Sequence, residues 1–477
     1  MQGCLTFFIV TNAARSAHIT LLGASISITQ FGLSYSLGTT NRLEGPAAGT
    51  DSVVLAVSPG IETWTATANA TWLHLSVTNQ GGTGSANVIF TYDANTGATR
   101  TGTLIIAGQL LTAIQAGSSY VPAPRPVTTL VSGPPYLYGL AVDGAGNVYF
   151  DSEDFPIIEK WTAVSNKVTT LIVSGLPSFN NAGVAMDGAG NLYLASGSAI
   201  YKWTAASNTI STPISSGLSA AQDVAVDAAG NIYIADSGHN AIKEWTLANN
   251  KVTTLVSSGL NNPQGVAVDA AGNVYIADTF NNAIKEWTAA NNTVTTLVSS
   301  GLRYPSGVAM DGAGNVYIAD TSNNAIKEWT AANNTVTTLV SSVLRYPSAV
   351  AVDGAGDVYI VDTFNNAIKE LPRAFVDPTA KWEGPAAGGD ALPVVLPATE
   401  NLLAPFKPTS GQLWLTISGI TNGTVSFAFT ADTGRPSRHR NARRRVGRDH
   451  SCGSPGPRWR PDTPPPLVHP RYILRPS

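Results

Sequence analysis

One stretch of thirteen residues, Val266–Asp278 (VAVDAAGNVYIAD), recurs along the chain with few changes. Near copies stand at residues 224–236, 308–320 and 350–362. A fixed period of about 40–50 residues is typical of repeat arrays and propellers, so the repeat constrains the fold before any single residue does. The aspartate of the shared VDxxGN pattern recurs at intervals of 44, 40, 42, 42 and 42 residues, at Asp143, Asp187, Asp227, Asp269, Asp311 and Asp353.

Each repeat predicts four short strands in a meander. In the fourth copy, GVAVD and NVYIAD are joined by a glycine-containing turn, AIKEWT follows TFNN, and VTTLV follows the next Asn-rich turn. Short runs of β-branched and aromatic residues favour strands, and Asn and Gly favour the tight turns between them. Four-stranded meanders at this period are the blades of a β-propeller.

Side-chain size changes along the repeat as it should in blades that converge on an axis. The isoleucine and tryptophan of AIKEW lie three residues apart and face opposite sides of the strand, so we expect each blade to be covered on both faces. The small residues of the first strand are Ala141, Ala185, Ala225, Ala267, Ala309 and Ala351, and the tryptophans of the third strand are Trp161, Trp203, Trp245, Trp287 and Trp329.

The number of outer strands predicts how the ring closes. A VTTLV-like strand occurs six times, and its first copy, Val127–Val131, precedes the first repeat. No such strand follows Ala367–Pro372, the last third strand. We therefore predict that residues 127–131 complete the sixth blade, which pairs two edges that would otherwise invite aggregation. The predicted fold class is all-β, a six-bladed β-propeller over residues 127–372 with flanking β-sandwich modules.

The repeat resembles the NHL family. LNNPQGVAVDAAGNVYIADTFNNAI, at residues 260–284, is similar to the family pattern, with Asn-Ala in place of its His-Arg pair. The resemblance covers residues 127–372 and implies a six-bladed propeller that contacts proteins. Streptogramin-lyase-like and gluconolactonase-like propellers are further relatives. Lyases of this kind build a metal site from histidines, whereas the repeats here contain one histidine, His239.

The segments on either side of the repeats resemble each other. EGPAAGTD at residues 44–51 returns as EGPAAGGD at 383–390, and TWLHLS at 71–76 is matched by LWLTIS at 413–418. These segments resemble BACON domains, small immunoglobulin-like sandwiches, and the resemblance implies contact with carbohydrate or glycoprotein. We expect the end of one sandwich at 1–30, a complete sandwich at 31–118, a linker at 119–126 and a truncated sandwich at 373–434.

Residues 435–477 differ from the rest. In the complete sandwich ANTGATR leads into a strand, whereas the later copy leads into RPSRHRNARRRVGRDHSC. The tail holds eleven Arg and two Asp, a charge of +9, and the rest holds 17 basic and 29 acidic residues, a charge of −12. We predict a disordered or frameshifted tail, with the frame changing near Gly434. The alternative is an evolved basic arm for an anionic partner.

Composition favours an exported β-rich protein. Charged residues make up 12% of the chain, and two cysteines, Cys4 and Cys452, do not make a disulfide framework. No apolar run approaches the roughly 20 residues that cross a bilayer. MQGCLTFFIV lacks a basic lead and a cleavage site, so we assign no signal peptide and expect a start truncated within a sandwich. We expect an extracellular or cell-surface location, no membrane span and no nucleic-acid partner.

The repeat aspartates are predicted to be structural. A calcium loop needs about six to eight oxygen ligands, whereas each VDxxGN turn offers one carboxylate, one amide and backbone. Asp and Asn also stabilise turns through bonds to their own backbone. His239 is predicted to be a solvated turn residue. We assign turn roles and no metal to the six VDxxGN aspartates and to the four that end the second strand: Asp236, Asp278, Asp320 and Asp362.

No motif predicts catalysis, since a phosphate loop, G-x-S-x-G and a Cys/His pair are all missing from the sequence. Nearly identical blades present the same side chains repeatedly, whereas an active site needs different groups at one point. We name no catalytic residue and no cofactor.

The loops that lead into the first strands hold the candidate ligand-binding residues. LRYPSG and LRYPSA place Arg303, Tyr304, Arg345 and Tyr346 on neighbouring blades, and the first blade offers Tyr136 and Tyr138. Arg and Tyr are favoured where a surface binds a partner. The alternative is that Pro and Tyr only cover the ends of the blades.

These features predict a secreted or surface bacterial binding or adhesion protein, whose partner is an extracellular protein or a glycan. One alternative is an enzyme of the streptogramin-lyase or gluconolactonase type, for which irregular loops near Glu153, Asp154 and His239 would matter more. Another is an architectural spacer without a specific ligand.

Overall fold

A computed structural model gives the structure of the chain. It describes residues 15–21, 24–30, 33–58, 62–122, 127–133, 137–152, 157–172, 183–392, 395–397, 402, 407–421 and 423–432. Tyr136, Glu153, Asp154, both cysteines and the tail at 435–477 lie outside these ranges. The helical segments found within them are single 3-10 turns, and none has the length or hydropathy to span a membrane.

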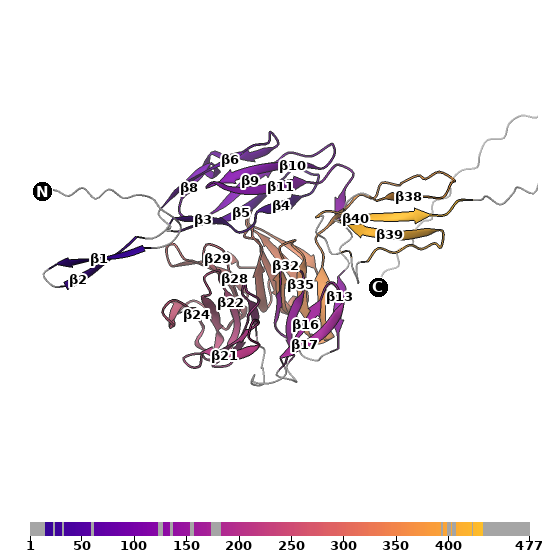
Figure 1. Cartoon of the computed structure of the whole chain (residues 1–477). Coiled ribbons are helices and arrows are strands. Elements are labelled where there is room, and N and C mark those ends of the chain that lie inside the picture. Colours follow the sequence, from indigo (N-terminus) through magenta and orange to yellow (C-terminus); the bar gives the residue numbers. More distant parts are fainter. Residues whose placement is uncertain are drawn as a thin grey trace, which may run out of the picture. The chain divides into compact units, whose positions relative to one another are not determined.

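Six four-stranded antiparallel sheets form a β-propeller in the described part of the chain, which confirms the predicted fold class (Figure 1). In blades 1 to 5 the strands pair in chain order from the innermost outward. Blades 1 to 6 consist of β14 (Leu140–Val142), β15 (Val148–Ser152), β16 (Ile157–Thr162) and β17 (Lys167–Ile172); β18 (Val184–Met186), β19 (Leu192–Ser196), β20 (Ala199–Thr204) and β21 (Thr209–Ile214); β22 (Ala221–Val226), β23 (Ile232–Asp236), β24 (Ala241–Thr246) and β25 (Lys251–Val256); β26 (Pro263–Val268), β27 (Val274–Asp278), β28 (Ala283–Thr288) and β29 (Thr293–Val298); β30 (Pro305–Met310), β31 (Val316–Asp320), β32 (Ala325–Thr330) and β33 (Thr335–Val340); and β34 (Pro347–Val352), β35 (Val358–Asp362), β36 (Ala367–Leu371) and β13 (Thr128–Ser132).

The sixth blade takes its outer strand from the other end of the repeat region. β13 pairs antiparallel with β36, from Thr128 opposite Glu370 to Ser132 opposite Ala367. The first and last segments of the propeller are therefore hydrogen-bonded within one sheet, which closes the ring.

A short turn follows the second strand of blades 3 to 6. The residue directly after this turn is an asparagine in the left-handed conformation, with φ between 49° and 53°. Asn tolerates this conformation better than most residues, which explains the NN of the repeat. The turns are η2 (Ser237–His239), η3 (Thr279–Asn281), η4 (Thr321–Asn323) and η5 (Thr363–Asn365).

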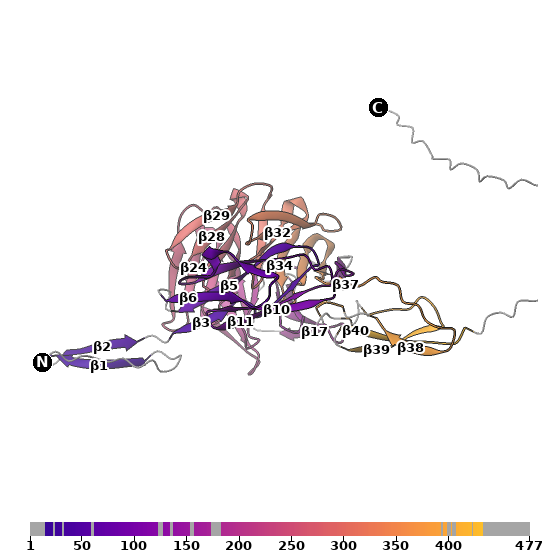
Figure 2. The ribbon, with the colours of Figure 1, turned by 90° about the horizontal axis from the view of Figure 1, so that it is seen from above.

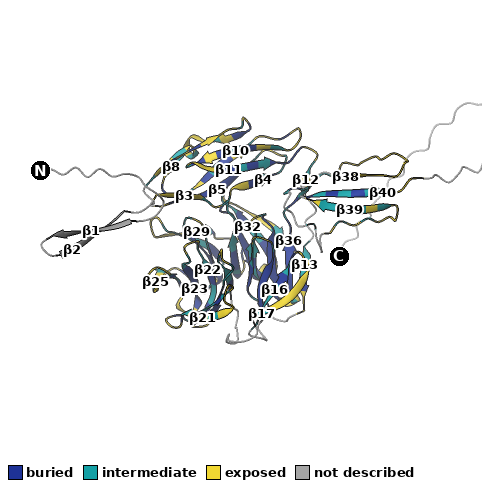
Figure 3. Cartoon of the chain, viewed as in Figure 1, coloured by how far each residue is buried: buried dark blue, intermediate teal, exposed yellow. Residues whose placement is uncertain are grey.

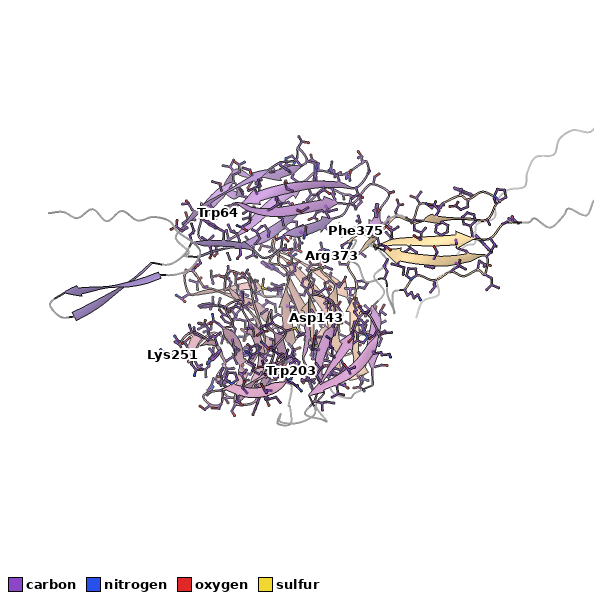
Figure 4. The ribbon with its side chains drawn as sticks, viewed as in Figure 1. Trp64, Asp143, Trp203, Lys251, Arg373 and Phe375 are labelled. Carbon is purple, nitrogen blue, oxygen red and sulfur yellow. The ribbon has the colours of Figure 1, made fainter. Side chains whose placement is uncertain are left out.

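The hydrophobic core of the propeller lies between neighbouring blades. Ile242 of β24 packs in a cluster with Trp287 of blade 4, whereas Trp245 of the same strand packs with Ile200 of blade 2. Each blade is thus covered on both faces, as the alternation in AIKEW indicates. Trp203 on β20 is labelled in Figure 4, and the outer strand β17 is largely exposed (Figure 3).

A β-sandwich precedes the propeller. Its core includes Trp64 and Phe90, both buried. One sheet orders as β3-β5-β9-β7 and the other as β4-β11-β10-β6-β8. Their bounds are β3 (Ser34–Leu37), β4 (Asn41–Glu44), β5 (Gly49–Ser58), β6 (Thr63–Ala68), β7 (Leu73–Leu75), β8 (Gly81–Thr83), β9 (Ala86–Tyr92), β10 (Arg100–Ile106) and β11 (Gln109–Gln115), with η1 (Val77–Asn79) after β7.

Strand β5 contacts the first hairpin of blade 5. The Ser52 hydroxyl donates to the Ala313 carbonyl at 2.8 Å, and the Val54 N–H donates to the Gly312 carbonyl at 3.2 Å. Residues 51–55 are buried without the alternation expected of a half-buried strand, because the sandwich core covers one face of β5 and the hairpin contacts the other. The sandwich face at β5 is therefore engaged within the chain.

Two partial copies of sandwich strands flank these domains. β1 (Arg15–Leu21) pairs with β2 (Ala24–Gln30) in the register of β10 with β11, so that Arg15 faces Gln30 as Arg100 faces Gln115. β38 (Gly388–Ala391), β40 (Thr424–Phe429) and β39 (Leu415–Thr421) form a three-stranded sheet that matches β5-β9-β7 (Figure 2). A further two-stranded pair joins β12 (Val121–Pro122) to β37 (Phe375–Val376).

The third sandwich copy has one sheet where the complete sandwich has two, within the described residues. Trp72 of the complete copy is 9% exposed, whereas Trp414 at the matching position is 53% exposed. In the complete sandwich β10 and β11 belong to the second sheet, and the sequence equivalent to them in the third copy lies outside the described part.

Candidate functional site

The inner strands of the six blades surround a cavity of about 660 Å³. Alanines from all six blades line it, because a larger residue at the innermost position would fill the space where the blades converge. The predicted small first-strand residues thus form the cavity wall: Ala141, Ala185, Ala225, Ala267, Ala309 and Ala351.

Five aromatic residues lie where the incoming loops and the 3-10 turns meet this cavity, and we call them the aromatic rim: Tyr138, Phe280, Tyr304, Tyr346 and Phe364. Tyr304 is 45% exposed and packs edge-on against Phe280, with ring centroids 5.7 Å apart. Tyr346 is 40% exposed and stacks on Phe364 at 4.6 Å. Exposed aromatic pairs around a cavity give flat apolar surfaces to a ligand.

The backbone at Tyr304 and Tyr346 is left-handed, with φ of 49° and 57°. Blade 4 has Asn262 at this position with φ of 52°, a residue type that adopts the conformation easily. The backbone N–H of Tyr304 donates to the side-chain oxygen of Asn282 at 2.8 Å, and that of Tyr346 to Asn324 at 2.7 Å. These bonds from the preceding blade hold both tyrosines in a conformation that is costly for them.

The predicted arginines do not line the cavity. The guanidinium of Arg345 lies 5.6 Å from the ring centroid of Phe364, on the exposed side of the aromatic rim. Arg303 is exposed, and its backbone N–H donates to Asp320 at 2.7 Å. The structure therefore brings Tyr138, Tyr304 and Tyr346 to one cavity and leaves the two arginines outside it.

Asp223 is a lining residue that the sequence analysis did not identify. The equivalent positions in the other blades are Gly139, Gly183, Gly265, Gly307 and Ala349, so a comparison of the repeats position by position could have revealed it. Among the described residues that line the cavity, Asp223 is the one with a charged side chain.

The Asp223 side chain lies between the inner strands of blades 3 and 4. At Gly265 a Cβ would meet the Ser306 carbonyl at 2.4 Å, so the equivalent position in blade 4 has no room for a side chain. In blade 3 the corresponding position does hold a side chain. The Asp223 carboxylate accepts the backbone N–H groups of Val224 at 2.9 Å and of Val266, in blade 4, at 3.0 Å. Burial raises the pKa of Asp223 to about 7, although these two bonds lower it.

The VDxxGN aspartates organise the first hairpin of each blade; Asp143 is labelled in Figure 4. In blade 4, one oxygen of Asp269 accepts the backbone N–H groups of Ala271 and Asn273, both at 2.8 Å. The other oxygen accepts the Asn273 side-chain amide at 2.8 Å. Both carboxylate oxygens are therefore occupied by the turn itself.

The aspartates that end the second strands hold three segments together. One oxygen of the fully buried Asp278 accepts the backbone N–H of Asn261 in the incoming loop at 2.7 Å. The other contacts the Asn281 amide at 2.8 Å and the Lys285 ammonium at 2.7 Å. The lysine of AIKEW, which the sequence analysis did not single out, compensates the buried charge. Matching ion pairs join Asp236 to Lys243, Asp320 to Lys327 and Asp362 to Lys369.

His239 is the last residue of η2, and its side chain is half exposed. Its Nδ1 lies 2.8 Å from the Asp236 carboxylate, where the other blades place an asparagine amide. Within the described ranges, no group of three or more His, Cys, Asp or Glu side chains is placed to hold a metal ion.

Comparison with known families separates the two domains. Residues 141–363 match the family model described as SMP-30/gluconolactonase/LRE-like region. Residues 62–116 match BACON, described as a putative binding domain. The propeller match is thus to a gluconolactonase-like family, while the predicted BACON resemblance is recovered within the complete sandwich. No curated protein matches the chain significantly in sequence.

Several solved structures resemble the chain at low identity. A Bacteroides thetaiotaomicron protein of unknown function is 16% identical and covers 71% of this chain and 98% of its own, with a TM-score of 0.46. A gluconolactonase from Xanthomonas campestris is 13% identical, with coverage of 53% and 90% and a TM-score of 0.45. Virginiamycin B lyase from Staphylococcus aureus, crystallised with quinupristin, is 12% identical, with coverage of 68% and 99% and a TM-score of 0.41.

Proposed function

We propose that the chain is a binding protein whose propeller holds part of a ligand in the inner cavity while the aromatic rim contacts the rest. The observation that carries this proposal is that two half-exposed tyrosines, Tyr304 and Tyr346, stand at the cavity mouth in a left-handed conformation. Blades 3 and 4 have Ala220 and Asn262 at this position with the same backbone. A non-glycine residue in this conformation costs on the order of 1 kcal/mol, and such strain concentrates at functional sites. Asn262 shows that the repeat itself does not require tyrosine there.

The ligand we propose is an extracellular glycan or glycoprotein. Aromatic faces on the rim suit the apolar faces of sugar rings, and the side-chain amides of Gln222 and Gln264 in the cavity suit hydroxyl groups. The BACON match supports a binding role for the sandwich. We also propose that the protein is secreted or displayed on the cell surface, and that its repeats are of the NHL type.

A glycan and extracellular-protein array tests this function. Wild type should bind a defined set of ligands, and the double variant Tyr304→Asn/Tyr346→Asn should lose that binding while it stays folded, because asparagine fits the backbone. Arg303→Ala/Arg345→Ala is the matched control on the same loops, and we expect it to retain most of the binding. Equal binding by wild type and the tyrosine variant would overturn the proposal.

A second candidate is an enzyme of the gluconolactonase or streptogramin-lyase type. The Asp223 carboxyl favours it, since a pKa of about 7 suits a general acid or base. The match of residues 141–363 to the gluconolactonase-like family model also favours an enzyme. The test is turnover of glucono-lactone and quinupristin by wild type and by Asp223→Asn. Turnover that disappears in the variant would establish the enzyme, and no turnover by wild type would leave the binding function.

A further inference from the structure

We propose that the cavity recognises a small organic cation, with a ligand ammonium group at the Asp223 carboxylate and the ligand body against the aromatic rim. This inference rests on the proposed binding function and names the chemistry of the bound group.

The first argument is charge compensation. The four aspartates that end the second strands are fully buried, and each has a lysine ammonium within 2.8 Å. Asp223 has no ion pair among the described residues, and the undescribed residues 173–182 of the preceding loop contain no Lys, Arg or His. An ionised carboxylate at this partly buried position is stabilised by a partner charge, and a ligand cation would supply it.

Among the described strands next to Asp223, no other charge is free. β23, the strand paired with β22, carries Asp236, which is paired with Lys243 at 2.6 Å. β18 and β26, which flank β22 around the cavity, have no ionisable side chain in their described residues. Two backbone N–H groups occupy one lone pair on each carboxylate oxygen, which leaves capacity for an N–H donor from a ligand.

The second argument is the aromatic rim. Ammonium groups are attracted to the faces of Tyr and Phe rings, and aromatic surroundings stabilise such cations where water is excluded. The described lining residues include one carboxylate, five aromatic side chains and no basic side chain, so the cavity favours a ligand that carries an ammonium group over an otherwise similar anionic or neutral one. If Asp223 had only a structural role, that role would consist of its bonds to the backbone N–H groups of Val224 and Val266.

Methionine methyl NMR can test the inference inside the cavity. The chain has three methionines, and two of them, Met186 and Met310, line the cavity on blades 2 and 5. The probes are n-butylammonium with its neutral analogue n-butanol, and protonated N-methylglucamine with sorbitol. The second pair distinguishes an amino-polyol ligand from an alkylamine. At pH 8 both amines stay largely charged and Asp223 is ionised.

We expect the methyl signals of Met186 and Met310 to shift with at least one amine, with an apparent affinity about tenfold or more above that of its neutral analogue. Asp223→Asn should remove this preference, and Glu244→Gln, which removes a half-buried carboxyl of the same blade outside the cavity lining, should keep it. If Asp223→Asn does not fold, lowering the pH of wild type from 8 to 5 should weaken amine binding by protonating Asp223.

Equal shifts from amine and neutral analogue, unchanged in Asp223→Asn, would overturn the cation inference and leave the binding function standing. No shift from any of the four probes would also overturn it, while the array decides the binding function separately.

Discussion

Blades 3 and 4 have the same strands, turns and buried tryptophan, yet they differ at the inner wall of the cavity. Blade 3 has Asp223 where blade 4 has Gly265. In the incoming loop, blade 3 has Ala220 and blade 4 has Asn262, at the position where blade 5 has Tyr304. Residues repeated from blade to blade, such as Asp278 and its equivalents in blades 3, 5 and 6, bind other parts of the same chain. Two of the residues that vary, Asp223 and Tyr304, line the cavity. The repeated residues therefore stabilise the blades, and the positions at which one blade differs from the others indicate the candidate site.

The shared carboxylates should dominate stability. Asp278→Asn removes the charge that pairs with Lys285 and leaves that lysine mostly buried without its partner. We expect a loss of about 3 kcal/mol in the free energy of unfolding, measured by urea denaturation. Val164→Ala, at a highly exposed position, is the control and should change it by less than about 0.5 kcal/mol. A loss of similar size in both variants would contradict a structural role for the repeat aspartates.

The cavity carboxylate should instead appear in the pH dependence of stability. The pKa of Asp223 is about 7 in the folded protein and about 4 when unfolded, so the folded state holds its proton more tightly. Stability from this group is present below pH 4 and is lost as the pH rises to 7. With partial exposure allowed for, the loss should be about 1–2 kcal/mol, and Asp223→Asn should lack it.

Glu44 and Glu370, whose pKa values burial also raises to about 8, act in the same direction in wild type and variant. The difference between the two pH profiles, measured by urea denaturation from pH 4 to 8, therefore reports Asp223. Parallel profiles would show that Asp223 titrates normally.

The rim tyrosines should matter little for folding. In Tyr304→Asn/Tyr346→Asn the relieved backbone strain offsets the lost ring contacts with Phe280 and Phe364, each worth about 1 kcal/mol. We expect the free energy of unfolding to stay within about 1 kcal/mol of wild type. The reciprocal change, Asn262→Tyr, should destabilise blade 4 by about 1 kcal/mol. A large loss in the double variant would mean that the tyrosines serve packing.

Removal of divalent cations should have the smallest effect. The oxygens of Asp269 are occupied by the backbone and amide groups of its own hairpin, and the hairpins of blades 1, 2, 3 and 5 have the same amide bond. In blade 6 Asp357 replaces the asparagine, and the Tyr359 hydroxyl donates to the second oxygen of Asp353. EDTA should therefore leave the Tm unchanged in a calorimetric scan. A drop in Tm that calcium restores would show that the repeat aspartates bind metal.

Much of the fold could be predicted from the sequence because the repeated residues indicate the strands, the turns and the period of the propeller. The position of Tyr304 and Tyr346 at one end of the propeller also follows from the order of strands. Their meeting at one cavity does not, because it depends on how six inner strands converge. The pairing of Asp278 with Lys285 became apparent only once the hairpin register was known.

Asp223 was missed for a different reason. The repeat pattern is defined by the residues that the blades share, and a single departure in one inner strand does not contribute to it. Its burial and its bond to Val266 depend on the spacing between two blades, which local sequence does not report. The contact of Ser52 with Ala313 was equally hidden, since it joins residues 261 positions apart.

The most direct test of the binding cavity is a crystal structure of the protein with the tightest ligand found on the array. We predict ligand density between the aromatic rim and Asp223, with a ligand nitrogen about 2.7–2.9 Å from the carboxylate, as in other charge-assisted hydrogen bonds. Density confined to the sandwich or to the outer strands of the blades, with the cavity free of ligand, would contradict the account.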